Sequence, residues 1–150
     1  MKSFIIYLLI ETLVSLDRKV VIEYARKWCN NYNPIYIKYT DEGEAGNFAS
    51  QCLYEGGESF SGCAGKDIRG MIPNFNNFFK CLEQKGWKNS DLVNTKASEV
   101  KPGYIVNHKR RYSPMIVTGY KGEKITVCQH DTNRCDEEID LNNLIYYYKE

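Results

Sequence analysis

The chain has 150 residues, which fits one domain and leaves little room for a second. Hydrophobic residues make up 43% and charged residues 26%, values typical of a globular chain that buries a core rather than of a disordered one. The net charge of +1 argues against nucleic acid as a partner, and the lack of a long uncharged apolar run argues against a membrane span.

The N-terminus resembles a short secretory signal peptide at residues 1–16. Lys2 precedes an apolar run from Phe4 to Ile10, although Glu11 interrupts the apolar region and no small residue precedes the expected cleavage point. The alternative is a helix whose apolar face packs on the domain. Under the signal hypothesis the protein is secreted, and a single domain occupies residues 17–150.

If the chain is secreted, its six cysteines lie in an oxidising compartment, where they can form disulfides. Cys128 and Cys135 flank a polar turn and are the first candidates for a disulfide, followed by Cys63 and Cys81. Cys52 is expected to be a small buried side chain. The chain has no CxxC knuckle and too few clustered ligands for zinc, so we expect neither a metal nor another cofactor.

Three helices are predicted in the first part of the chain, at residues 17–30, 45–55 and 74–85. Asp17 is placed to cap the first helix, and Asn30, Asn31 and Pro34 favour its end. Apolar residues recur at three- and four-residue spacing in all three segments, and glycines follow the second and third.

After residue 97 the pattern changes to runs rich in β-branched and aromatic residues. We expect strands at residues 104–107, 112–120, 124–130 and 144–149, separated by turn residues. Helices followed by strands predict an α+β fold, with the N-terminal helices packed on one side of an antiparallel sheet. The basic run at residues 109–111 lies between two strands and is interpreted as a solvated loop.

Several segments resemble the putative amidase domain family, which is related to the papain-like NlpC/P60 cysteine hydrolases. The most specific segment is Asn47–Gly57, read as NFASQCLYEGG. The match also includes Asp17–Trp28 with Asn33-Pro34, then Lys101-Pro102-Gly103, Met115–Gly119 and His130-Asp131-Thr132. The resemblance covers nearly the whole predicted domain and implies a papain-like fold.

The resemblance also implies where the catalytic residues of the family would fall. The nucleophilic cysteine falls on Ala45, the histidine base on Ser113, and the third polar residue, which orients the base, on His130. Tyr104 stands where the family usually has an aspartate. A methyl group cannot attack an amide carbonyl, and a serine without a base is a poor replacement, so the nucleophile and the base are both missing.

No other residue is an evident substitute for the missing pair. His108 is expected to be an exposed loop histidine, and Cys52 lies two helical turns after Ala45 on the inward stripe. The residues expected to line a substrate groove are Glu44, Asn47 and Tyr112.

Three hypotheses for function remain open at this point. The first is a catalytically degenerate relative that binds a peptide, a peptidoglycan fragment or a protein. The second is an active cysteine amidase that carries an inactivating change from Cys to Ala at position 45. This hypothesis does not explain why Ser113 stands in place of the histidine base. The third is a secreted, disulfide-stabilised structural or interaction domain. Loss of both reactive groups favours the first hypothesis.

Overall fold

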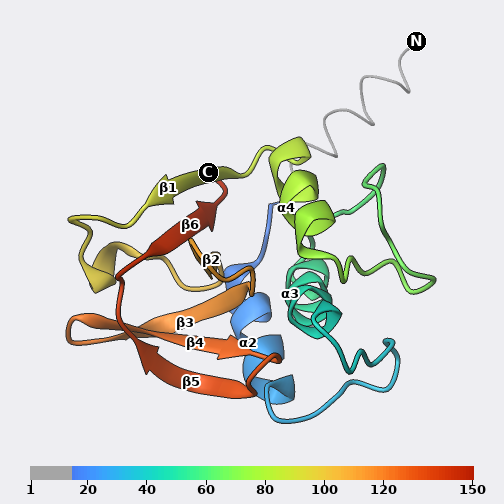
Figure 1. Ribbon diagram of the computed structural model, residues 1–150, viewed down its shortest axis with the longest axis horizontal. Coiled ribbons are helices and arrows are strands. Elements are labelled where there is room, and N and C mark those ends of the chain that lie inside the picture. The colour runs from blue at the N-terminus through green and yellow to red at the C-terminus, as the bar shows by residue number, and fades with distance from the viewer. Residues whose placement is uncertain (1–14) are drawn as a thin grey trace.

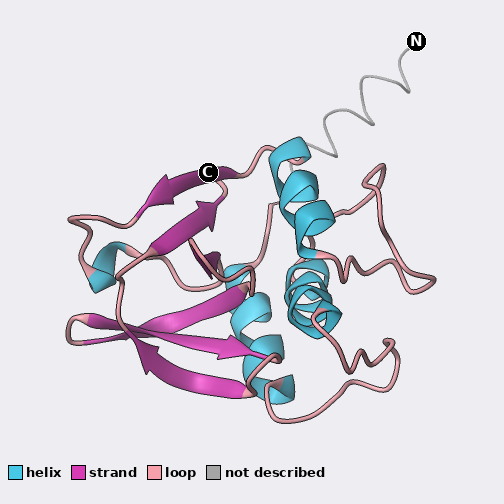
Figure 2. Cartoon of the chain, in the orientation of Figure 1, coloured by secondary structure: helices cyan, strands magenta, loops and turns pink. Residues whose placement is uncertain are grey.

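The computed structural model describes residues 15–150, so the predicted signal segment lies almost wholly outside the described residues. Within these residues, three α-helices gather on one side of a six-stranded antiparallel sheet, which confirms the predicted α+β architecture (Figures 1 and 2). None of the helices within residues 15–150 combines the length and the apolar character needed to cross a membrane.

The helices begin and end close to the predicted residues. Helix α2 (Arg18–Trp28) starts after Asp17, whose carboxylate accepts hydrogen bonds from the backbone N–H groups of the first turn. Helix α3 (Gly43–Glu55) begins two residues earlier than predicted, and Gly57 at φ 101° follows it. Helix α4 (Phe75–Gln84) is capped by Asn74, which accepts from the N–H of Asn77.

The sheet has the strand order β1-β6-β2-β3-β4-β5. The strands are β1 (Lys88–Asp91), β2 (Ile105–His108), β3 (Met115–Lys121), β4 (Lys124–Gln129), β5 (Arg134–Ile139) and β6 (Leu144–Tyr148), with a short 3₁₀ helix η1 (Ala97–Glu99) before β2. Strand β6 lies between β1 and β2, so the last strand of the chain is interior to the sheet.

The two edge strands, β1 and β5, were missed by the sequence analysis. Both are rich in exposed polar residues, such as Asn89 in β1 and Glu137 and Glu138 in β5. An edge strand pairs on one side only and need not bury an apolar face, so it lacks the alternation on which strand prediction depends.

The core lies between the helices and the sheet. Helix α3 is its centre, because ten consecutive residues of this helix, Glu44 to Leu53, are buried. Phe48 and Leu53 from α3 and Phe78 from α4 join one hydrophobic cluster with the inward residues of β2, β3 and β4. Burial of this apolar surface is the main favourable contribution to folding.

Two disulfides join elements that are separate in the sequence, and they correct one predicted pairing. Cys63 pairs with Cys81 as expected, but Cys135 pairs with Cys29 rather than with Cys128. Cys128 and Cys52 are free and buried. Cys128 lies in β4 with its side chain in the core, whereas the end of α2 brings Cys29 to β5. The short turn between Cys128 and Cys135 does not indicate that the distant Cys29 lies beside Cys135 in the fold.

Tyr104 directly precedes β2, and its ring packs against Arg18 of α2. The guanidinium of Arg18 lies 5.4 Å from the centre of the Tyr104 ring, and Arg18 Nη1 donates to the carbonyl of Pro102 at 3.1 Å. Gly103 has φ 90°, and a Cβ at this position would lie 2.6 Å from Cβ of Arg18. The turn before β2 therefore packs directly against the first turn of α2.

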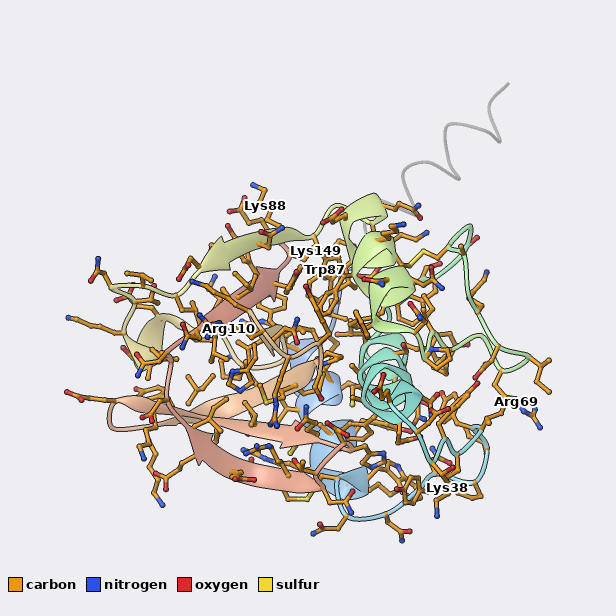
Figure 3. The ribbon with its side chains drawn as sticks, viewed as in Figure 1. Lys38, Arg69, Trp87, Lys88, Arg110 and Lys149 are labelled. Carbon is orange, nitrogen blue, oxygen red and sulfur yellow. A yellow bond between two sulfur atoms is a disulfide. The ribbon has the colours of Figure 1, made fainter. Side chains whose placement is uncertain are left out.

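The loop after α3 is fixed by a buried carboxylate as well as by a disulfide. Glu58 accepts from Trp87 Nε1 at 2.9 Å and from Lys149 Nζ at 3.1 Å. Trp87 and Lys149 lie beside each other in Figure 3. These contacts connect the loop to the segment before β1 and to the end of β6.

Candidate functional site

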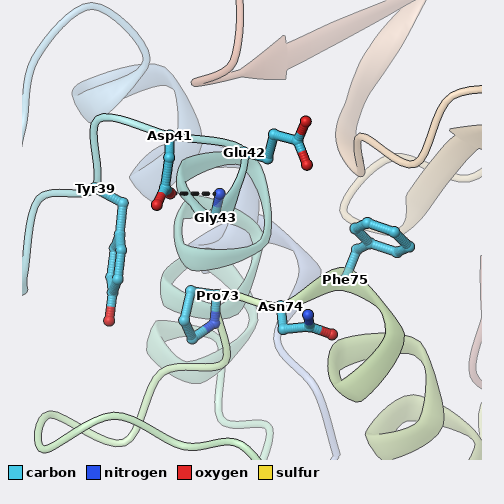
Figure 4. A pocket seen from close by; sticks show the side chains of 7 residues that line it. All are labelled: Tyr39, Asp41, Glu42, Gly43, Pro73, Asn74 and Phe75. Atoms are coloured by element: carbon cyan, nitrogen blue, oxygen red, sulfur yellow. Dashed lines mark hydrogen bonds between the residues drawn. The ribbon is translucent and has the colours of Figure 1, made fainter.

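A pocket of about 480 Å³ lies at the first turn of α3 (Figure 4). Its wall comes from the loop before α3, from Gly43, and from the segment that leads into α4. The lining residues are Tyr39, Asp41, Glu42, Gly43, Pro73, Asn74 and Phe75. Asp41 Oδ1 accepts from the N–H of Gly43 at 2.8 Å, which fixes the loop at the start of the helix.

Ala45, the position of the family nucleophile, is the third residue of α3 and is 3% exposed. The segment before α4 covers this part of the helix closely, because a Cβ on Gly46 would lie only 2.4 Å from the carbonyl oxygen of Pro73. Cys52 lies two turns further along, with no exposed surface, as the sequence analysis predicted.

Ser113, the position of the family base, lies in the loop before β3. Its hydroxyl donates to Asp131 Oδ2 at 3.1 Å and accepts from Gln129 Nε2. Gln129 Nε2 also donates to the backbone carbonyl of Ser113 at 3.0 Å. Gln129 Oε1 in turn accepts from Arg134 Nε at 3.2 Å, which orients the amide with its N–H groups toward Ser113.

His130, the expected third polar residue, is buried just after β4. Its Nδ1 lies 2.5 Å from Glu44 Oε2, and its Nε2 lies 2.5 Å from the carbonyl oxygen of Trp28. A carbonyl only accepts hydrogen bonds, so Nε2 carries a proton and donates it to the carbonyl of Trp28. The ring also stacks on Phe48 with centroids 3.8 Å apart.

Ser113 and Glu44 both contact one short segment, residues 129–131. Gln129 and Asp131 contact Ser113, while His130 between them contacts Glu44, the residue before Ala45. The register of β4 and β5 shifts between Val127 and Gln129, at the end of β4. A shift of this kind changes the direction of the following side chains. Gln129 therefore contacts Ser113, whereas His130 contacts Glu44 and Trp28.

Gln129 is the residue that the sequence analysis missed at this site. The resemblance directed attention to His130, whereas the side chain in contact with Ser113 is the adjacent amide. The available signal was a Gln directly before His130 at the end of a predicted strand, in a position that an alternating strand places on the opposite face from its neighbour.

The three residues expected in the groove have different surroundings. Tyr112 is 57% exposed and stacks on Phe75 of the pocket wall, with ring centroids 4.7 Å apart. Glu44 and Asn47 are buried, and Asn47 Nδ2 donates to Glu44 Oε1 at 3.0 Å and to the carbonyl of Ile37 at 2.8 Å. These two side chains therefore hold the loop before α3 from inside.

The pocket has a negative electrostatic character. Asp41 and Glu42 are the charged residues of its lining, and both are carboxylates. Burial, followed by a hydrogen bond to Asp67, raises the pKa of Tyr39 to about 12, so the phenol is neutral at ordinary pH. Within residues 15–150, no group of three or more His, Cys, Asp and Glu side chains is arranged to hold a metal ion.

The fold and the site define an α+β domain whose candidate site lies where a buried helix begins beside an antiparallel sheet. The family model described as a putative amidase domain matches residues 15–149, and the chain belongs to this family. No curated protein and no solved structure matches the chain.

Proposed function

We propose that the chain is a catalytically degenerate member of the amidase domain family that binds an amide-containing ligand without cleaving it. The observation that carries this proposal is the buried methyl group of Ala45 at the first turn of α3, where the family resemblance implies a thiol. The relation to the papain-like NlpC/P60 hydrolases is part of the proposal. It is supported by the order of elements, a central helix followed by an antiparallel sheet.

The remaining cysteines are poor nucleophiles in this fold. Four of the six, all of which lie in the described chain, form disulfides. Burial raises the pKa of Cys128 to about 11, and burial also raises the pKa of Cys52 well above its ordinary value. A thiol attacks an amide as the thiolate, so neither group is suited to nucleophilic attack at neutral pH.

His130, which contacts Glu44 directly before Ala45, is also unsuited to act as a base. Both ring nitrogens of His130 are engaged, one with Glu44 and one with the carbonyl of Trp28. His108 is the other histidine, and it lies at the end of β2. A general base needs a free nitrogen within hydrogen-bond reach of the proton that it accepts.

The pocket at the first turn of α3, which Gly43 lines two residues before Ala45, supports the binding part of the proposal. Its volume of about 480 Å³ and its aromatic wall of Tyr39 and Phe75, extended by Tyr112, suit a short peptide segment. The ligand is a peptide, a peptidoglycan fragment or a protein segment, and the two lining carboxylates favour one that carries a positive charge.

Restoring the two missing groups tests the proposal. We expect the double variant Ala45→Cys/Ser113→His to cleave amide bonds in purified peptidoglycan or in short peptide anilides, because it supplies the nucleophile and the base at the two positions that the family resemblance implies. The wild-type chain and each single variant are expected to show no thiol-dependent cleavage. Iodoacetamide should abolish the restored activity, and circular dichroism confirms that each variant is folded.

Two results would contradict the proposal. Thiol-dependent cleavage by the wild-type protein would restore the hypothesis of an active enzyme. A folded double variant without activity, together with a wild type that binds neither peptidoglycan fragments nor cationic peptides in equilibrium dialysis, would favour a purely structural domain.

We also propose that the protein is secreted. The two disulfides support this, since such bonds persist mainly in oxidising compartments. Mass spectrometry of the natural product tests it, because a mature N-terminus near Asp17 is expected and a chain that retains residues 2–16 would contradict signal cleavage.

A further inference from the structure

A second, larger cavity of about 710 Å³ lies away from α3 and α4. Three segments form its walls: the hairpin between β3 and β4, the region of η1, and the turn between β5 and β6, which lie together at the left of Figure 1. The lining residues are Thr95, Lys96, Ala97, Ser98, Tyr120, Gly122, Glu123, Asp140, Leu141 and Asn142. None of them belongs to the pocket at the first turn of α3.

The walls of this cavity present an exposed aromatic ring among polar groups. Tyr120 is 56% exposed, although an aromatic ring on a sheet usually packs against its neighbours. Hydroxyl groups come from Thr95 and Ser98, an amide comes from Asn142, and carboxylates come from Glu123 and Asp140. These donors and acceptors line the cavity, where a ligand can reach them.

We propose that this cavity binds a neutral pyranose oligosaccharide. The C–H face of a pyranose ring is apolar and packs on an aromatic face, while its hydroxyl groups both donate and accept hydrogen bonds. Carboxylates accept hydrogen bonds from such hydroxyls, amides both accept from them and donate to them, and the cavity offers both groups beside Tyr120. Its charged groups are Lys96, Glu123 and Asp140, so a strongly anionic ligand is disfavoured.

A nuclear magnetic resonance titration of the ¹⁵N-labelled protein tests this site. The probes are the tetramer of β-1,4-linked glucose and the corresponding tetramer of N-acetylglucosamine. We expect at least one of them to shift the backbone amide signals of Lys96, Ser98 and Asn142 in a saturable manner. Shifts with both probes indicate recognition of the shared pyranose face, and shifts with the second alone indicate recognition of an acetamido sugar.

The substitution Tyr120→Ala is expected to weaken binding about tenfold, because it removes the aromatic face on which the sugar ring packs. Tyr54→Ala is the matched control, because Tyr54 is 52% exposed but lies on α3 outside this cavity. The dispersion of the amide signals reports whether each variant is folded.

Any of three results would overturn the assignment. These are no shift with either saccharide at millimolar concentration, unchanged affinity in a folded Tyr120→Ala variant, or shifts confined to residues 41–43 and 73–75. The last result would place the saccharide in the pocket at the first turn of α3 instead. The outcome is independent of whether the amide-binding function proposed for that pocket holds.

Discussion

The buried imidazole of His130 connects the end of β4 to helices α2 and α3. Its partners are the carbonyl of Trp28 at the end of α2 and the carboxylate of Glu44 at the start of α3, and its ring packs on Phe48. This residue therefore positions the helix tip that carries Ala45. Its contribution is to the geometry of the site, whether or not chemistry occurs there.

We expect His130→Ala to lower the free energy of unfolding by about 3 kcal/mol, because it removes the partner of Oε2 in the buried carboxylate of Glu44. Urea denaturation measures this loss. Lys88→Ala is a suitable control, since it removes the exposed pair between Lys88 and Glu150 and should leave the midpoint unchanged. An equally small effect of the His130 substitution would show that the pair does not stabilise the fold.

His108 gives the chain a pH dependence of known direction. Burial, and then the charges of Arg134 and Arg111, lower the pKa of His108 below its ordinary value. The unfolded chain binds a proton at His108 more readily than the folded chain does. The contribution of neutral His108 to the free energy of unfolding is therefore fully present above pH of about 6.5, and it is lost as the pH falls through the lower pKa of the folded state. An NMR titration of the His108 ring should give a midpoint below about 6.5. His108→Asn should remove this part of the pH dependence, and a folded midpoint at or above the ordinary value would contradict the argument.

At the scale of elements, the two disulfides enclose loops of very different length. The Cys63–Cys81 bond closes a separation of 18 residues, and the Cys29–Cys135 bond closes 106. Since closure of a longer loop removes more entropy from the unfolded chain, replacement of Cys29 and Cys135 by Ala should cost about 5 kcal/mol, and replacement of Cys63 and Cys81 about 3 kcal/mol. Denaturant unfolding of the two double variants compares these losses. The reverse order would mean that strain or residual structure outweighs loop entropy.

The elements that the sequence predicted are those whose pattern is local. Helices α2 and α4 have periodic apolar faces and recognisable N-caps, glycines follow α3, and strands β3, β4 and β6 have apolar or aromatic runs. The polar edge strands β1 and β5 carry no such pattern. Their place in the sheet is decided by backbone pairing with β6 and β4, which a sequence window does not show.

The candidate site shows the same division between local and long-range information. The helical position of Ala45 and the inward direction of Cys52 follow from the spacing of residues within α3. The contact between Gln129 and Ser113, and the disulfide between Cys29 and Cys135, depend on how distant strands and helices meet. No local pattern of residue types distinguishes Cys29 from Cys128 as the partner of Cys135.

At the scale of the whole molecule, the two proposed binding cavities lie in separate regions of the domain. One cavity adjoins the first turn of α3, and the other lies between the β3–β4 hairpin, η1 and the β5–β6 turn. The two sets of lining residues do not overlap, so substitutions in one cavity should leave ligand binding at the other unchanged.

The interior position of β6 has a consequence for local motion. Strand β1 pairs with β6 and lies at the edge of the sheet, so β1 has no other strand to hold it when β6 detaches. The backbone amides of both strands should therefore exchange with deuterium as one cooperative unit, with Ser90 protected no longer than Tyr146. The unit that opens would join residues 88–91 to residues 144–148, two segments more than fifty residues apart along the chain.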